Sequence, residues 1–213
     1  MGNCEAQSKI AFVLAQMIEL MDGTTKEHIE RTAGYVKTLI EAMVEKRLYI
    51  NEISKWDIDV VVAASRFHDI GKIAIPSNLL FKADKLTCDE YAIVRTHVHR
   101  GAAIIKLISE IFGNNEFLQH AILFAENHHE KWDGAGYPNG LAETLIPLHG
   151  RIMAIVDVYD ALTSIRQYKE AMSHEEAIKI IYDEHGKHFD PKIVDIFVKM
   201  QDQLTFERND RYG

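Results

Sequence analysis

Apolar residues recur with a helical period along most of this chain. In the segment 25–47 they fall on one helical face, at Ile29, Val36, Leu39, Ile40 and Met43. Helical patterns also cover the segments 57–69, 88–97, 101–112, 116–128 and 150–164. No segment shows the alternation of apolar and polar residues that is typical of a half-buried strand. The pattern therefore predicts an all-α fold, a bundle of helices.

Capping residues and turns mark the ends of the predicted helices. Thr87 and Glu90 have the spacing of a capping box at a helix start. The run Gly113-Asn114-Asn115 predicts a turn, and Asp190-Pro191 predicts the start of the last helix. Residues 130–149 hold three glycines and two prolines, so we expect a loop there.

No low-complexity segment, repeat or linker rich in proline and glycine divides the 213 residues. We expect a lead-in helix over residues 1–22 and one catalytic domain over residues 23–213. Apolar residues in the lead-in have the seam spacing of a short coiled coil, at Ile10, Leu14, Met17 and Met21. An amphipathic helix packed on the core fits this pattern. A signalling helix that joins two copies, or that follows an upstream sensor or receiver domain, also fits.

Composition excludes several classes of protein. Hydrophobic residues make up 47% and charged residues 26% of the chain, which is an ordinary globular balance. A net charge of -8 argues against a broad surface for polymeric nucleic acid, but not against a small anionic ligand beside local cations. Two cysteines make no disulfide framework, and no apolar run is long enough to span a membrane. A cytoplasmic protein is expected.

Two pairs of adjacent polar residues carry the candidate chemistry. His68-Asp69 lies among apolar residues, and His128-His129 precedes the glycine-rich loop. A buried carboxylate next to imidazoles is tolerable when a cation compensates its charge. Imidazole suits zinc, iron, manganese or nickel, and a carboxylate can bridge two such ions. These pairs therefore predict a metal site.

His68-Asp69 resembles the signature of the HD superfamily of metal-dependent phosphohydrolases. The run His128-His129 with Asp133-Gly134-Ala135-Gly136-Tyr137-Pro138 resembles the HD-GYP subfamily, which hydrolyses cyclic di-GMP. The motifs occur in the order of the family, and the resemblance covers residues 20–204. It implies an HD-domain helical bundle in which a loop carries the Gly-Tyr-Pro motif.

The resemblance also implies a set of metal ligands. One ion would be held by His28, His68, Asp69 and Asp157. A second would be held by Asp69, His97, His128 and His129, so that Asp69 bridges the two. Iron or manganese is expected first, with nickel, zinc and magnesium as alternatives. Family members with a third ion use a Glu four residues before the leading His, where this chain has Thr24, so two ions are expected.

Substrate-binding residues are likewise implied by the resemblance. Lys72 would bind a phosphate oxygen beside the metals, and Arg166 and Lys169 resemble the phosphate-binding pair of the family. Tyr137 would lie near the ligand. A metal-bridging hydroxide would attack phosphorus and release the ribose 3′ oxygen, giving linear pGpG and, after a second round, GMP. Asp69 and Lys72 are thus the expected catalytic residues.

Two alternatives remain at this point. The chain could hydrolyse another cyclic dinucleotide such as cyclic GMP-AMP, or it could bind cyclic di-GMP as a receptor without cleaving it. Asp160 is interpreted as support for a ligand rather than as a ligand. Several histidines match no ligand position and are expected to be structural: His99, His120, His149, His174 and His185.

Overall fold

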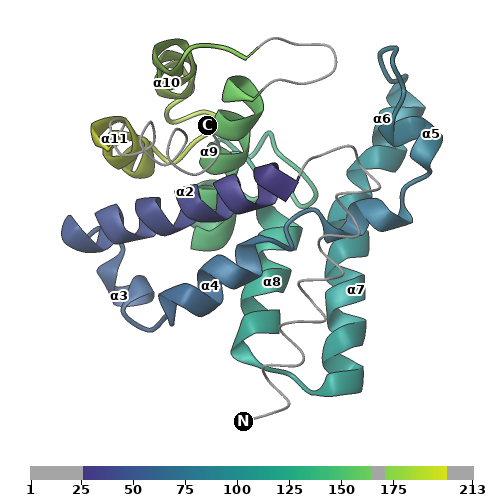
Figure 1. Cartoon of the computed structure of the whole chain (residues 1–213), viewed down its shortest axis with the longest axis horizontal. Helices are drawn as coiled ribbons and strands as arrows, with labels where there is room; N and C mark the ends of the chain where they lie inside the picture. The colour runs from purple at the N-terminus through teal and green to yellow at the C-terminus, as the bar shows by residue number, and fades with distance from the viewer. Residues whose placement is uncertain (1–25, 165–170, 201–213) are drawn as a thin grey trace.

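The computed structural model describes residues 26–164 and 171–200, and Figure 1 shows their arrangement. The lead-in segment 1–22, Thr24, Arg166 and Lys169 lie outside these ranges. The longer helices are α2 (Lys26–Glu45), α4 (Ile58–Ser65), α6 (Cys88–Arg95), α7 (His97–Phe112), α8 (Glu116–Asn127), α9 (Leu148–Thr163), α10 (His174–Asp183) and α11 (Pro191–Lys199). Short helices are α3 (Ile50–Ile53), η1 (Ile70–Ala74), α5 (Ser77–Leu80) and η2 (Glu143–Leu145).

Helix α9 forms the centre of the bundle. It is buried along nearly its whole length and packs against α2, α8, α10 and α11. Helix α4 fills the space between α2 and α8, and α7 lies along α8 (Figure 1). The α5–α6 segment stands away from the bundle, and α7 is the one other helix in the described ranges against which α6 packs more than marginally. The core therefore sits around α9, which also carries two buried or half-buried carboxylates.

The all-α prediction is confirmed, since the described ranges contain only helices, turns and two isolated β-bridges. Most predicted helix ends are also correct. Thr87 and Glu90 form the expected capping box of α6, and the side chain of Asn115 accepts a hydrogen bond from the Leu118 backbone N–H at the start of α8. Asp190 caps α11 at the Lys192 N–H, with Pro191 in the first turn.

Two predicted boundaries are wrong. Helix α4 ends at Ser65, and the His68-Asp69 pair lies in the turn before η1 rather than in the helix. The predicted helix through residue 97 instead breaks at Thr96, and His97 begins α7. These breaks let Asp69 and His97 point toward the same group of polar side chains. The spacing of apolar residues does not predict such breaks.

Two glycines set the position of the turn that carries Asp69. A Cβ added at Gly71 would lie 1.8 Å from the His97 carbonyl oxygen, and one at Gly101 would lie 3.1 Å from the Gly71 nitrogen. The η1 backbone can therefore pack directly on α7. This contact places Asp69 beside the first residue of α7.

The loop between α8 and α9 is tied to the segment before α11. The backbone N–H groups of Trp132 and Asp133 donate to the carbonyls of His188 and Lys187 at 3.0 and 2.8 Å. No helix in the described ranges is both long and apolar enough to cross a membrane.

Candidate metal centre

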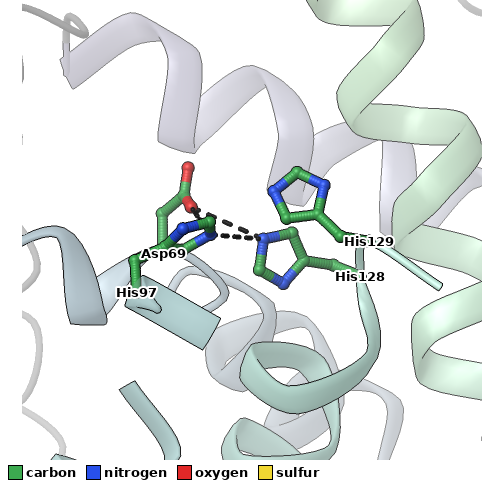
Figure 2. Close-up of side chains that lie close together, drawn as sticks. All are labelled: Asp69, His97, His128 and His129. Carbon is green, nitrogen blue, oxygen red and sulfur yellow. Dashed lines mark hydrogen bonds and ion pairs between the residues drawn. The ribbon is translucent and has the colours of Figure 1, made fainter. Parts of the chain in front are cut away.

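Four side chains from three parts of the fold converge in what we call the Asp69 cluster: Asp69, His97, His128 and His129. Asp69 comes from the turn before η1, His97 from the first turn of α7, and the two adjacent histidines from the end of α8. Each offers a ligand atom within 4.8 Å of the others. Figure 2 shows the carboxylate and the His97 ring facing the two rings that follow α8.

A second group, the Asp157 cluster, consists of His28, His68 and Asp157. His28 lies in the first turn of α2 and Asp157 on α9, where the His28 Nε2 and the Asp157 Oδ1 are 3.9 Å apart. The His68 ring lies edge-on to the His28 ring, with centroids 6.0 Å apart. Helix packing around α9 therefore gathers residues that are about 130 positions apart in the sequence.

Asp69 lies between the two clusters. Its Oδ1 is 3.3 Å from the His97 Nε2 and 3.5 Å from the His128 Nε2. Its Oδ2 is 3.5 Å from the His68 Nε2 of the Asp157 cluster. Each carboxylate oxygen thus faces a different cluster, which is the geometry that a carboxylate shared by two cations requires.

The orientation of three histidine rings is fixed by backbone carbonyls. The Nδ1 of His68 lies 3.0 Å from the Ser65 carbonyl, that of His97 lies 2.7 Å from the Val94 carbonyl, and that of His128 lies 3.1 Å from the Phe124 carbonyl. A carbonyl only accepts, so each Nδ1 carries the proton. When the rings are neutral, their Nε2 atoms therefore present lone pairs to the clusters, as metal-bound histidines do.

These lone pairs are unfavourable without a cation. The Nε2 atoms of His97 and His128 are 3.3 Å apart, and neither neutral ring has a proton to place between them. The His68 Nε2 and the Asp69 Oδ1 are buried and have no hydrogen-bond partner among the described residues. A buried polar atom without a partner costs about 1–3 kcal/mol. The donor set and its unpaired atoms fit divalent cations.

The protonation equilibria of the Asp69 cluster agree with this chemistry. Burial raises the pKa of Asp69, but the positive charge of the neighbouring Lys72 ammonium opposes burial, and the pKa lies well below its usual range. Burial lowers the pKa of His97 to about 4. Burial, with a contribution from His128, also lowers the pKa of His129 far below its ordinary value. At neutral pH, Asp69 is an anion and both rings are neutral.

Asp160 supports the Asp157 cluster. Its Oδ2 accepts from the His28 Nδ1 at 2.5 Å, and its Oδ1 accepts from the Arg31 Nε at 2.7 Å. The His28 Nε2 is thereby left as the available ring nitrogen. Burial raises the pKa of Asp160, but hydrogen bonds from His28 and Arg31 lower it by more than burial raises it. The pKa is therefore below its ordinary value, and this carboxylate stays ionised. The contacts agree with the interpretation of Asp160 as support for a ligand.

Two predicted substrate residues border the Asp69 cluster. The Lys72 Nζ lies 2.9 Å from the Asp69 Oδ2, which places its charge at the carboxylate shared by the clusters. The Tyr137 ring stacks on the His129 ring with centroids 4.7 Å apart. Burial, together with Tyr91 and Asp69, raises the pKa of Tyr137 above its ordinary value, so its hydroxyl keeps its proton.

Sequence reasoning missed Glu130, which holds the loop that carries Tyr137. This carboxylate is buried and accepts hydrogen bonds from the Asn139 and Leu141 backbone N–H groups at 2.8 and 3.0 Å. At Gly136 an added Cβ would lie 2.3 Å from the Lys131 nitrogen, so the loop can fold this tightly only with glycine there. A carboxylate directly after His128-His129 was the available signal.

Three other predicted residues lie outside the described ranges: Thr24, Arg166 and Lys169. Their roles, and the number of metal ions inferred from Thr24, therefore stay predictions. The lead-in helix and the domain boundary at residue 23 also stay predictions.

Comparison with known proteins places this fold and site in a family. A family model for the HD domain matches residues 12–193. The chain belongs to the HD domain family. The family resemblance read from the His-Asp and Gly-Tyr-Pro motifs is confirmed, because relatives of this HD domain are named cyclic di-GMP phosphodiesterases.

Two relatives from Vibrio cholerae serotype O1 show what similar HD domains are named for. A probable cyclic di-GMP phosphodiesterase is 43% identical over 193 residues, which cover 90% of this chain and 44% of that protein. A 3′3′-cGAMP-specific phosphodiesterase is 35% identical over 200 residues, which cover 94% of this chain and 36% of that protein. The chain spans less than half the length of these relatives.

A solved structure agrees with the fold of this HD domain. The crystal structure of a cyclic GMP-AMP specific phosphodiesterase from Vibrio cholerae superposes with a TM-score of 0.59 at 20% identity, covering 96% of this chain and 49% of that one. This likeness supports the all-α HD fold.

Proposed function

We propose that this HD domain is a metal-dependent phosphodiesterase that hydrolyses cyclic di-GMP to linear pGpG, and pGpG in turn to GMP. The observation that carries the proposal is the 3.3 Å approach of the His97 and His128 Nε2 atoms beside Asp69, with both Nδ1 protons already committed to carbonyls. Such a site is built for a cation, and cations are what hydrolysis of an anionic phosphodiester needs.

The two clusters divide the ligands between two ions. His28, His68, Asp69 and Asp157 would hold one, and Asp69, His97, His128 and His129 would hold the other. Two divalent cations would supply an activated water and would neutralise the charge of the phosphate. Mixed imidazole and carboxylate ligands favour iron or manganese over magnesium.

Other residues would bind and orient the substrate. Lys72, already beside Asp69, can donate to a phosphate oxygen at the reacting end. Arg166 and Lys169 would bind phosphate as well, and Tyr137 would contact the ligand from the glycine-rich loop. Because Glu130 anchors this loop by two backbone hydrogen bonds, Tyr137 is held against His129 before the substrate arrives.

Cyclic di-GMP is favoured as the substrate over cyclic GMP-AMP by the comparison of relatives. The relative named for cyclic di-GMP is 43% identical to this chain, and the one named for cGAMP is 35% identical. The two substrates differ in one purine, so the metal clusters alone do not discriminate between them.

The test is turnover of both cyclic dinucleotides by protein loaded anaerobically with Fe(II) or Mn(II), with products separated by chromatography. We expect conversion of cyclic di-GMP to pGpG, a lower kcat/KM for cyclic GMP-AMP, and loss of both activities after chelation. A higher kcat/KM for cyclic GMP-AMP would refute the substrate assignment. Tight binding of cyclic di-GMP without hydrolysis by fully loaded protein would show a receptor instead.

A further inference from the structure

Arg95 is an exposed residue whose guanidinium is nevertheless held in place. It ends α6, and its Cζ lies 4.1 Å from the centroid of the Tyr137 ring and 5.9 Å from that of Tyr91. Tyr91 is four residues earlier and so shares a face of α6 with Arg95. A cation over an aromatic face is attracted by the ring quadrupole. The two tyrosine rings therefore hold the guanidinium of Arg95 in a fixed position at the end of α6.

Tyr137 connects this cation to the metal centre. Its ring stacks on His129 at 4.7 Å with an angle of 27° between the planes, and its backbone N–H donates to the His129 carbonyl at 3.1 Å. The Tyr137 ring thus contacts both the Arg95 guanidinium and the His129 ring of the Asp69 cluster, which places the guanidinium close to the metal centre.

The donors of Arg95 are available to a ligand. A guanidinium stacked on a ring keeps its N–H groups at its edge. Arg31, Arg66 and Arg151 donate to carboxylates. Arg95 makes no hydrogen bond or ion pair with any residue in the described ranges, and its guanidinium contacts the Tyr137 and Tyr91 rings instead. A fixed fork of donors beside a metal centre is suited to a phosphate.

A cyclic dinucleotide has two phosphodiester groups, and only one of them can lie at the metal clusters during cleavage. The other carries a negative charge in a protein whose net charge is -8. We propose that Arg95 binds this second phosphodiester and so selects cyclic dinucleotides over substrates with a single phosphate. This inference rests on the proposed function and adds a residue to the substrate site.

The test compares Arg95→Ala with the wild type on two substrates under the same metal loading. Cyclic di-GMP has the second phosphodiester, and bis(p-nitrophenyl) phosphate lacks it. We expect the KM for cyclic di-GMP to rise about tenfold with kcat nearly constant, since one exposed charge-assisted contact is lost. The loss of kcat/KM on bis(p-nitrophenyl) phosphate should be at least fivefold smaller than the loss of kcat/KM on cyclic di-GMP. Arg95→Lys keeps the positive charge but lacks the forked donors of a guanidinium. Its KM for cyclic di-GMP should lie between those of the wild type and Arg95→Ala.

Lys179→Ala is the matched control, because it removes one exposed cation from α10, on the other side of the molecule (Figure 1). Arg95→Ala kinetics equal to those of this control would overturn the proposal. An equal loss on both substrates would also overturn it, because Arg95 would then act by supporting Tyr137 and the metal centre. A much larger loss on cyclic di-GMP than on cyclic GMP-AMP would assign Arg95 to a base instead of a phosphate.

Equilibrium binding of cyclic di-GMP keeps this inference separate from the proposed activity. If the wild-type protein binds cyclic di-GMP without hydrolysing it, the proposed phosphodiesterase activity is refuted. The role of Arg95 is then tested by the affinity for cyclic di-GMP alone. About tenfold weaker binding by Arg95→Ala would still support the phosphate contact, and unchanged affinity would refute it.

Discussion

Two pairs of buried histidines in this HD domain look alike and do different things. In the Asp69 cluster, the Nε2 atoms of His97 and His128 approach to 3.3 Å. At the other end of α8, the His120 Nδ1 and the His149 Nε2 approach to 2.8 Å, beside the Trp56 ring. Both pairs join residues from different parts of the fold, and all four residues are buried.

The protons distinguish the two pairs. The His149 Nε2–H can donate to the His120 Nδ1, while the His120 Nε2–H points to the Glu116 Oε1 at 3.4 Å. Both rings are then neutral, and every proton has an acceptor. Only the His149 Nδ1 is left without a partner among the described residues. In the Asp69 cluster both Nδ1 protons are used by carbonyls, so two lone pairs and a carboxylate face one another.

Burial of histidine therefore does not by itself indicate a metal site. What matters is which ring nitrogen the backbone already satisfies, and whether a carboxylate stands where the remaining nitrogens meet. The first pair needs a cation where its two Nε2 atoms meet, whereas in the second pair a ring proton can lie between the two nitrogens that meet. The following variants test that distinction, from the largest expected effect to the smallest.

Asp69→Ala should remove both cations, because one carboxylate serves both clusters. Loss of a shared ligand should exceed the tenfold to 100-fold effect typical of outer contacts, so turnover of cyclic di-GMP should fall by more than about 100-fold. Elemental analysis and product chromatography measure both quantities. Asp183→Ala, which removes an exposed carboxylate of α10, is the control. Two metals per chain and normal turnover in Asp69→Ala would sink the assignment.

Asp160→Asn should weaken only the ion of the Asp157 cluster. The neutral amide offers one oxygen where the His28 Nδ1 and the Arg31 guanidinium both donate, so the ring loses its fixed orientation. We expect a tenfold to 100-fold loss of affinity for one ion, on the order seen for such supporting contacts. Titration with Mn(II) measures both sites. Equal weakening of both ions would contradict the separate clusters.

The His120–His149 pair should make stability depend on pH. Burial, followed by His120 and Arg151, lowers the pKa of His149 to about 3, whereas an unfolded histidine has a pKa of about 6.5. The unfolded chain gains a proton that the folded one resists, so the free energy of unfolding falls as pH drops below about 6.5, by up to about 1.4 kcal/mol per pH unit. When the pH falls from 6.5 to 5, the free energy of unfolding measured in urea should decrease by up to about 2 kcal/mol less in His149→Leu than in the wild type. Parallel losses in both proteins would show that His149 does not titrate in this way.

His149→Leu should also leave the metal content unchanged at neutral pH. Its cost is structural, about 1–2 kcal/mol, because the His120 Nδ1 loses its partner. His128→Leu is the counterpart in the Asp69 cluster and should lose a metal ion. Loss of metal from His149→Leu would mean that the two pairs are not distinct.

Much of the site could be predicted from the sequence because its residues are adjacent or in family motifs. His68-Asp69 and His128-His129 are visible as pairs, and the His-Asp motif led to His28, His97 and Asp157. The structure brings all seven ligand candidates into two groups. The resemblance also separated His120 and His149 from these residues, although burial alone would not have done so.

The remainder depends on contacts that no local pattern encodes. The breaks before His68 and at Thr96 follow from packing of η1 on α7, not from apolar periodicity. Glu130 holds backbone groups nine and eleven residues away, and Arg95 meets Tyr137 across 42 positions of sequence. Such pairings appear only when the chain is folded, because α6 and the glycine-rich loop are brought together by other elements.

The most direct test of the account is to count and locate the ions in crystals of protein loaded anaerobically with Fe(II) or Mn(II). Anomalous diffraction should show two ions. One should lie among Asp69, His97, His128 and His129, and the other among His28, His68, Asp69 and Asp157. No peak should appear at His120 and His149. Three full sites would refute the count inferred from Thr24, and an absence of ions from both clusters in active crystals would contradict the account itself.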